Sequence, residues 1–296
     1  MRGANPAAAL EQSIERDGII RRGDRVLVAC SGGADSVALA AALCAVSKPM
    51  DLNVALAYVH HGTRDSAWQD ECVVLRVAAT FGVPAHVAAL EGNAHDEASL
   101  RAGRYGALVA IAQSLQSTVI ATGHHAEDQS ETVVLALLRG TGPDGLAGMS
   151  PRRPLAAEID LARPFLRIAS EELRYYCHVH ALPYAVDPTN ADADMRRNAL
   201  RGALETLRPL FPGLDAAVAR AAELVGSERS GAPRAEMRAR VRAALQAEGS
   251  LQDIDFEHVE AAVRALERGG SGRFFMRPGI ELRIKSGALE VVLKDA

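Results

Sequence analysis

The chain is poor in lysine and in aromatic residues. Only Lys48, Lys285 and Lys294 among its 33 basic residues are lysines, and aromatic residues make up 4% of the 296 positions. The net charge is −4, so the composition provides no diffuse positive surface for nucleic acid. Any nucleic-acid binding must therefore depend on local clusters of arginine. The scarcity of aromatic residues favours helix-rich layers over a β-sandwich.

Cysteine pairs and long apolar runs are also missing. None of the four cysteines (Cys30, Cys44, Cys72 and Cys177) belongs to a C-x-x-C pair. This argues against zinc ribbons, thioredoxin-like redox chemistry and cysteine-ligated clusters. No apolar stretch approaches the roughly 20 residues needed to span a bilayer, and none at the N-terminus has the length of a signal peptide. We therefore expect a cytoplasmic protein with no membrane segment.

The first two thirds of the sequence alternates short apolar runs with longer helical patterns. Strands are predicted at 25–30, 52–59, 83–89 and 118–121, and helices at 36–46, 66–80, 96–115 and 126–139. This alternation predicts an α/β fold with a doubly wound parallel sheet, which binds ligands at the carboxyl ends of its strands. Pro84 favours an edge position for the third strand.

The alternation weakens after Pro151. Helices are predicted at 169–180, 197–208 and 214–225, and a polar stretch with glycine and proline at 227–233 indicates a boundary. Two further helices, at 234–247 and 256–268, and short strands at 273–276, 281–285 and 289–293 predict a small α+β unit. The expected organisation is a catalytic domain at 1–208, a helical linker at 209–233 and a C-terminal domain at 234–296.

A glycine- and serine-rich segment, Ser31-Gly32-Gly33-Ala34-Asp35-Ser36, joins the first predicted strand to its helix. Its glycines allow a tight turn that presents backbone N–H groups to phosphate oxygens, and the helix N-terminus adds partial positive charge. Asp35 is a candidate ligand for Mg²⁺. The segment is neither a Walker loop nor a G-x-G-x-x-G turn. The alternative is a plain strand-to-helix turn without a ligand.

The same six residues match S-G-G-x-D-S, and the segment resembles the signature of the PP-loop ATP pyrophosphatases. The resemblance implies a Rossmann-like nucleotide-binding domain and cleavage of ATP between its α and β phosphates, giving pyrophosphate and an adenylylated substrate. This superfamily includes GMP synthetase, argininosuccinate synthetase, tRNA thiolases and lysidine synthetase. The loop alone does not choose between them.

A second polar segment, 123–132, reads Gly-His-His-Ala-Glu-Asp-Gln-Ser-Glu-Thr. On a helix Asp128 and Glu131 are three residues apart, so both carboxylates project from one face and can bind a metal ion or an ammonium group. A solvated first helical turn is the alternative, because acidic residues favour helix N-termini. His124 and His125 are equally candidates for capping or packing.

This segment resembles the G-H-H-x-D-D-Q-x-E-T signature of the tRNA(Ile)-lysidine synthetases, with Glu127 where aspartate is more usual. Other elements similar to that family follow in the expected order. They are His61-Gly62-Thr63-Arg64, then Glu97, Arg101, Arg104 and Tyr105, Arg163-Pro164-Phe165-Leu166, Asp187-Pro188-Thr189-Asn190, Arg196-Arg197-Asn198 with Arg201, and Gly272 to Gly279.

The resemblance implies that ATP, Mg²⁺, L-lysine and isoleucine tRNA with a CAU anticodon are the ligands. It further implies roles for individual residues. Nucleotide binding falls to Ser31, Gly32, Gly33, Ala34, Asp35, Ser36, His61 and Gly123. Asp35, Asp128, Glu131, Arg101 and Arg104 are the candidate catalytic residues, with Asp35 at the metal and the other four at the charged ends of lysine. Arg64, Arg197, Arg201 and the C-terminal domain are the candidate tRNA contacts.

Two other functions remain open. One is another PP-loop tRNA-modifying enzyme, such as a thiolase or an amidotransferase-like protein, which the missing cysteine pair and glutaminase segment disfavour. The other is a nucleotide-binding tRNA chaperone or sensor without catalysis. The sequence also leaves open a homodimer and the group that deprotonates the lysine amine.

Overall fold

A computed structural model describes residues 6–60, 67–90, 97–185, 195–229, 233–247, 256–277, 279–285 and 287–293. Its internal contacts divide the chain into two compact units, 1–221 and 222–296. The division falls inside one helix, α9 (Leu214–Arg229). The proposed division into a domain at 1–208, a linker at 209–233 and a domain at 234–296 stays a prediction.

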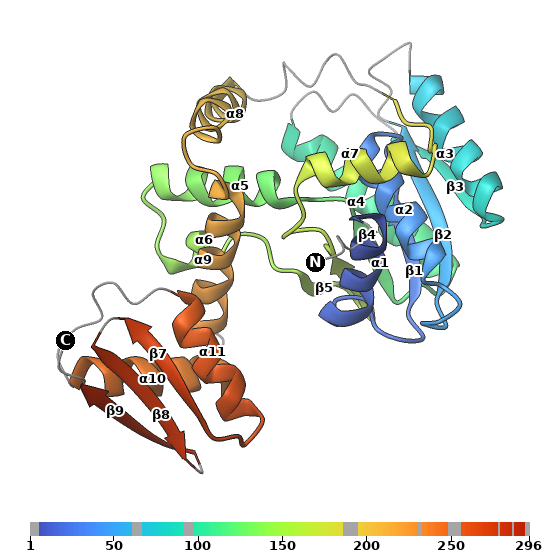
Figure 1. The fold of residues 1–296 in the computed structure, drawn as a ribbon. Coiled ribbons are helices and arrows are strands. Elements are labelled where there is room, and N and C mark those ends of the chain that lie inside the picture. The colour runs from blue at the N-terminus through green and yellow to red at the C-terminus, as the bar shows by residue number, and fades with distance from the viewer. Residues whose placement is uncertain are drawn as a thin grey trace. The chain divides into compact units, whose positions relative to one another are not determined.

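The first unit is built on a six-stranded sheet with the order β3-β2-β1-β4-β6-β5 (Figure 1). The strands are β1 (Arg25–Ala29), β2 (Asn53–His60), β3 (Ala85–Ala89), β4 (Val119–Thr122), β5 (Arg152–Ala156) and β6 (Ile159–Ala162). Neighbouring strands are parallel except for β5 and β6, which form an antiparallel hairpin. The predicted parallel α/β sheet is confirmed, and β3 lies at its edge as expected.

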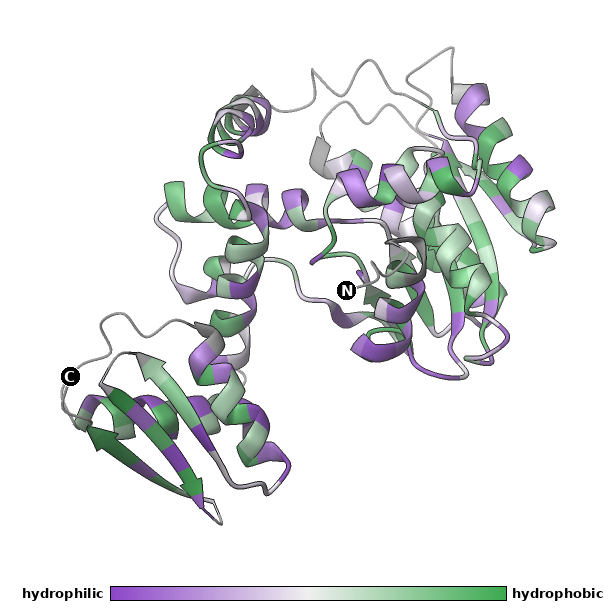
Figure 2. Ribbon diagram, in the orientation of Figure 1, coloured by the Kyte–Doolittle hydropathy of each residue, from purple (hydrophilic) through white to green (hydrophobic). Residues whose placement is uncertain are grey.

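Helices cover both faces of this sheet. The helices of the first unit are α1 (Pro6–Asp17), α2 (Ala34–Ala45), α3 (Ala67–Phe81), α4 (Glu97–Ser114), α5 (Ala126–Leu138), α6 (Pro143–Leu146), α7 (Ser170–Val179) and α8 (Met195–Leu207). On one face α1, α2, α3 and α7 share a core with Val26, Val28 and Leu56, whereas α4 packs on the other face against Leu27 and Ile120. Apolar residues fill the central strands, as Figure 2 shows.

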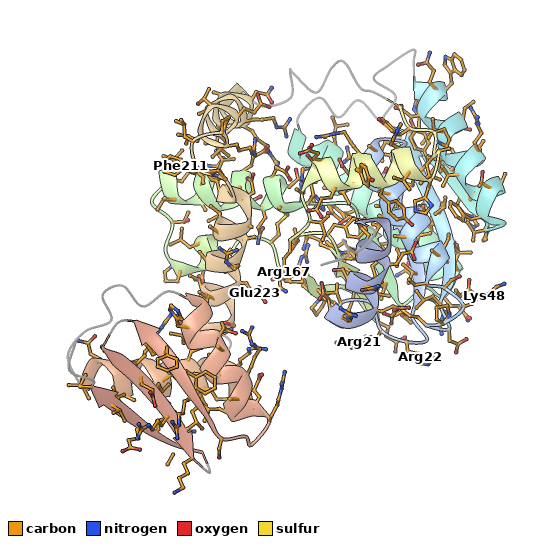
Figure 3. The ribbon with its side chains drawn as sticks, in the orientation of Figure 1. Arg21, Arg22, Lys48, Arg167, Phe211 and Glu223 are labelled. Carbon is orange, nitrogen blue, oxygen red and sulfur yellow. The ribbon has the colours of Figure 1, made fainter. Side chains whose placement is uncertain are left out.

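Residues 36–43 of α2 are all buried, because α1, α3 and α7 enclose the helix against the sheet. This burial fixes the start of α2, and with it the loop that joins β1 to α2. Arg21, Arg22 and Lys48 are exposed at the opposite edge, where strands begin (Figure 3). The loops that follow β1, β4 and β6 are therefore separated from these three basic side chains by the length of the sheet.

The second unit has a three-stranded antiparallel sheet, β7 (Gly272–Arg277), β8 (Ile280–Lys285) and β9 (Ala288–Leu293). Its helices α10 (Pro233–Ala247) and α11 (Phe256–Glu267) share a core with these strands. Apolar and polar residues alternate along β8, so that one face of the strand is buried (Figure 2). The predicted small α+β unit is confirmed.

No helix among the described residues is both long enough and apolar enough to cross a bilayer.

Candidate active site at the carboxyl edge of the sheet

The loop between β1 and α2 is held together by the hydroxyl of Ser36. Its Oγ accepts a hydrogen bond from the backbone N–H of Ser31 at 3.1 Å and donates one to the carbonyl of Gly33 at 2.9 Å. Gly32 has a φ of +85°, and a Cβ there would come within 2.9 Å of the Asp70 carbonyl oxygen. Only glycine fits this position. The loop is therefore a rigid backbone turn at a helix N-terminus, which is the geometry that binds phosphate.

Two distant segments support this loop. A Cβ on Gly123, just after β4, would lie 2.9 Å from the backbone carbon and oxygen of Asp35 and 3.0 Å from the Ser36 nitrogen. On the other side, the N–H of Ala185 donates to the Gly32 carbonyl at 2.9 Å. Ala34 is the first residue of α2. The structure thus brings the two sequence motifs, 31–36 and 123–132, into direct contact.

His125, the N-cap residue of α5, lies among three carboxylates. Its Nδ1 is 2.9 Å from Glu127 Oε2, and its Nε2 is 3.4 Å from Asp128 Oδ2 and 3.6 Å from Asp35 Oδ2. Burial lowers the pKa of His125, but the hydrogen bond with Glu127 and the other two carboxylates outweigh burial and raise that pKa. His125 therefore connects the phosphate loop to the carboxylates of α5.

Glu127 also connects α5 to α7 through hydrogen bonds. Both of its carboxylate oxygens accept from the Ser170 N–H, at 3.1 and 3.0 Å, and Oε1 accepts from the Ser170 hydroxyl at 3.0 Å. Burial raises the pKa of Glu127, but its contacts with His125 and Ser170 dominate and lower it to about 2. Sequence reasoning assigned no role to Glu127 or Ser170, and it named His125 only as a candidate for capping or packing, which agrees with its place as the N-cap residue of α5. Its one signal was the glutamate in place of the more usual aspartate.

Asp35 has one carboxylate oxygen without a partner. Oδ1 is buried and makes no hydrogen bond within the described part of the chain. Burial raises the pKa of Asp35, and the charge of His125 partly offsets this. Among the described residues, no three histidine, cysteine, aspartate or glutamate side chains are arranged so that together they could hold a metal ion. Mg²⁺ typically takes one or two carboxylates together with substrate phosphates, so Asp35 and Asp128 fit such an ion.

Glu131 is buried, with 2% of its surface exposed, and it is paired with two arginines of α8. Arg201 Nε lies 2.7 Å from Oε1, and Arg197 Nε lies 3.0 Å from Oε2. A further arginine nitrogen, Arg197 Nη2, is 3.9 Å from Asp128 Oδ1. Glu131, which was expected to bind lysine, is therefore paired with two arginines that were expected to bind tRNA. Both of those roles stay predictions.

Arg101 and Arg104 lie on α4 and are exposed. The Arg101 guanidinium is over the Tyr105 ring at 5.5 Å, and its charge acts on His124. His124 differs from its neighbour His125, because burial, together with the charges of Arg163 and Arg101, lowers its pKa to about 4. Its Nδ1 is 2.8 Å from the Thr122 hydroxyl. His124 is neutral at physiological pH.

His61, Arg64, residues 187–190 and the side chains of Glu97 and Arg196 lie outside the described part of the structure. Their expected roles at the nucleotide and at tRNA are untested.

Known proteins with similar sequences support the assignment of a nucleotide-binding site here. A family model described as a PP-loop domain matches residues 6–207. The tRNA(Ile)-lysidine synthase of Salinispora tropica is 40% identical over 230 residues, which covers 75% of this chain and 68% of the relative. The enzyme of the same name from Salinispora arenicola is 38% identical over 233 residues, covering 76% and 69%.

The fold is also found among solved structures. The U34-tRNA thiolase NcsA from Methanococcus maripaludis superposes with a TM-score of 0.64 at 17% identity, covering 75% of this chain and 78% of that one. At this level of identity the likeness concerns the fold alone.

The sheet, the serine-bound loop after β1 and the supporting glycine after β4 define a PP-loop ATP-utilising domain. The matches to the two Salinispora enzymes cover about three quarters of this chain, at 75% and 76%. The chain belongs to the tRNA(Ile)-lysidine synthase family.

Proposed function

We propose that the protein joins free L-lysine to the wobble cytidine of isoleucine tRNA with a CAU anticodon, using ATP and releasing AMP and pyrophosphate. One observation supports this reaction most strongly. The phosphate-binding loop and the carboxylates of α5 meet at His125, whose Nε2 faces both Asp35 and Asp128. A nucleotide and an amine can therefore be held side by side.

In the first step the cytosine carbonyl oxygen attacks the α-phosphorus of ATP, and the bond to pyrophosphate breaks. The backbone between Ser31 and Ser36 would bind the departing phosphates. Mg²⁺, held by Asp35, would supply positive charge that offsets the charge of the triphosphate. The unpartnered Oδ1 of Asp35 supports this placement.

In the second step the lysine ε-amine attacks C2 of the activated cytosine, the C2–O bond breaks and AMP leaves. The amine must be neutral to attack, so a base must accept its proton. Asp128 is better placed than Glu131 to contact an ammonium group, because both oxygens of Glu131 already accept from arginines. We propose that Glu131 acts through α8, by keeping Arg197 and Arg201 in place.

The proposed tRNA contacts combine these arginines with the C-terminal unit. Arg197 and Arg201 keep 30% and 36% of their side chains exposed, so phosphate can approach them while they remain paired. A phosphate contact releases counterions, so Arg197→Ala should weaken tRNA binding and reduce its salt dependence by roughly one unit. An unchanged salt slope would remove Arg197 from the tRNA surface. We propose a cytoplasmic location, where tRNA and ATP are found.

Three of the four cysteines are poorly suited to sulfur transfer. Burial raises the pKa of Cys44 to about 11 and that of Cys177 to about 12, and it also raises the pKa of Cys30. A thiol with a raised pKa is a poor nucleophile and a poor metal ligand.

A pyrophosphate-release assay tests the proposed function. The protein is mixed with ATP and CAU isoleucine tRNA, with and without lysine. We expect one equivalent of pyrophosphate without lysine, and continuous AMP release only when lysine is added. A protein that binds ATP and tRNA but releases no pyrophosphate would instead be a sensor or chaperone.

A further inference from the structure

A buried arginine lies at the same edge of the sheet and has no assigned role. Arg163 follows β6 directly and is 3% exposed. In the order β1-β4-β6 it is two strands away from the phosphate-binding loop. Adjacent strands are about 4.8 Å apart, so the separation along this edge is about 10 Å.

Arg163 has no carboxylate partner within the described part of the chain. Its Nη1 donates to the Ser150 carbonyl at 2.8 Å, whereas Nε is buried and has no hydrogen-bond partner there. Burial lowers the pKa of Arg163, and the side chain of Tyr105 partly offsets this. An arginine nevertheless remains charged, so a positive charge is buried here with no carboxylate partner among the described residues.

Two other arginines that the structure describes, one half-buried and one buried, are paired with carboxylates. Arg152, on the neighbouring strand, is 2.8 Å from Asp24 and 2.7 Å from Asp160. In the second unit Arg238 is paired with Glu260. Arg163 lacks such a carboxylate among the described residues, which makes its buried charge energetically unfavourable in the protein alone. An anionic ligand would remove that penalty.

The two histidines after β4 have neighbours of opposite charge. His125 faces carboxylates, including Asp35, whereas neutral His124 is near Arg163 and Arg101. The charge of Asp128 acts to raise the pKa of both histidines. This separation suits an amino acid, whose carboxylate and ammonium groups carry opposite charges. An extended lysine side chain is also similar in length to the separation between Arg163 and the phosphate loop.

We infer that Arg163, with Arg101 at its rim, binds the α-carboxylate of the amino-acid substrate while the side-chain amine is directed toward the phosphate-binding loop. This inference rests on the proposed function. It adds Arg163 to the residues that select a free amino acid over a simple amine. A phosphate group of ATP or tRNA has similar anion chemistry, and the experiment must distinguish these sources.

The test compares lysine with lysinamide, which keeps both amines but lacks the carboxylate. AMP release is measured with CAU isoleucine tRNA and ATP for wild type, Arg163→Met, Arg163→Lys and the control Arg153→Met, which removes an exposed charge from the same hairpin. Wild type should have a KM for lysinamide roughly 10- to 100-fold above its KM for lysine, the range expected for a lost charged hydrogen bond.

Arg163→Met should raise the KM for lysine into the lysinamide range and leave the KM for lysinamide nearly unchanged. Arg163→Lys should recover part of the preference, and Arg153→Met should behave as wild type. Equal KM values for the two amines in wild type would overturn the inference. So would a rise in the KM for ATP or the Kd for tRNA in Arg163→Met without a change for lysine, because the anion would then be a phosphate.

Thermal unfolding provides a second test that does not depend on turnover. Because no carboxylate of the described residues pairs with this charge, Arg163→Met without ligand should have a Tm no lower than that of wild type. Lysine should raise the Tm of wild type more than that of Arg163→Met. A lower Tm for the unliganded variant would mean that Arg163 has a structural role, and would contradict the inference. Absence of any lysine-dependent AMP release in wild type would instead refute the proposed function.

Discussion

Arg201 binds Glu131 through two nitrogens, with Nε 2.7 Å from Oε1 and Nη2 3.2 Å from Oε2. The two residues are 70 positions apart in the sequence. Their pairing ties α8 to α5, on which Asp128 and His125 are placed. One ion pair therefore connects a side chain expected to bind lysine, Glu131, with a side chain expected to bind tRNA, Arg201.

A double-mutant cycle measures this contact. Glu131→Gln and Arg201→Ala should each lower the free energy of unfolding, and together they should be less harmful than their sum, with a coupling of about 1–3 kcal/mol. Urea unfolding of the single and double variants gives the value. Arg21→Ala, exposed at the opposite edge of the sheet (Figure 3), is the control and should be neutral. Additive effects would show that the pair does not stabilise the fold.

Gly123 should tolerate no side chain. Gly123→Ala places a Cβ 2.9 Å from the Asp35 backbone, so the phosphate-binding loop must shift. We expect loss of most tRNA-dependent pyrophosphate release, with circular dichroism unchanged. Gly106→Ala is the matched control, because a Cβ there meets nothing within 4 Å. It should keep full activity and gain about 0.5–1 kcal/mol of stability from the helix propensity of alanine. Equal activity in both variants would contradict the predicted close contact.

Asp35 should be needed for chemistry and not for folding. Burial raises the pKa of this carboxylate, and its buried Oδ1 has no hydrogen-bond partner among the described residues, so Asp35→Ala removes a charge that is partly shielded from solvent. Pyrophosphate release should fall by roughly 100-fold or more, and Tm should be unchanged or higher. A variant that releases pyrophosphate at the wild-type rate over a range of Mg²⁺ concentrations would exclude Asp35 as the metal ligand.

The stability of the second unit should depend on pH through Glu260. Burial raises the pKa of Glu260, but Arg238 and Arg234 dominate and lower it below the ordinary value of 4.5. The ionised carboxylate therefore stabilises the fold at pH values above 4.5, and this stability is lost as the pH falls through the lowered pKa. At neutral pH Glu260→Gln should be less stable by about 3–5 kcal/mol, because Arg238 is left buried and unpaired.

Amide hydrogen exchange on β7 and β8 of the full chain reports this effect between pH 3 and 7. Protection should fall with decreasing pH in wild type and depend less on pH in Glu260→Gln. Glu228→Gln removes the carboxylate of an exposed pair with Arg242 and should change stability by no more than about 1 kcal/mol. A similar pH profile for wild type and Glu260→Gln would assign the acid sensitivity to another group.

Much of the fold could be predicted because its signals are local. The apolar runs that form β1, β2 and β4 are each followed by a helical pattern, and Pro84 correctly indicated an edge strand. The hairpin β5–β6 was missed, because Pro154 and two arginines obscure the first strand and the second has four residues. The helix α1 was also not predicted.

The sequence motifs of the candidate site could be predicted, but the contacts between residues distant in the sequence could not. The sequence showed that Asp128 and Glu131 share a helix face, but it could not show that α8 covers Glu131 with two arginines. Nor could it show that Gly123 touches the phosphate-binding loop, since that contact depends on the parallel pairing of β1 with β4. Burial of Arg163 without a partner is likewise a property of the folded chain.

The central claim is that lysine becomes attached to the wobble cytidine of the CAU isoleucine tRNA. Mass spectrometry of nucleosides from that tRNA, after incubation with the protein, ATP and isotopically labelled lysine, tests it most directly. We predict a cytidine product heavier by one lysine less one water and carrying the label, formed only when ATP is present. An unmodified cytidine under conditions in which ATP is consumed, or a product that contains sulfur and no lysine, would contradict the account.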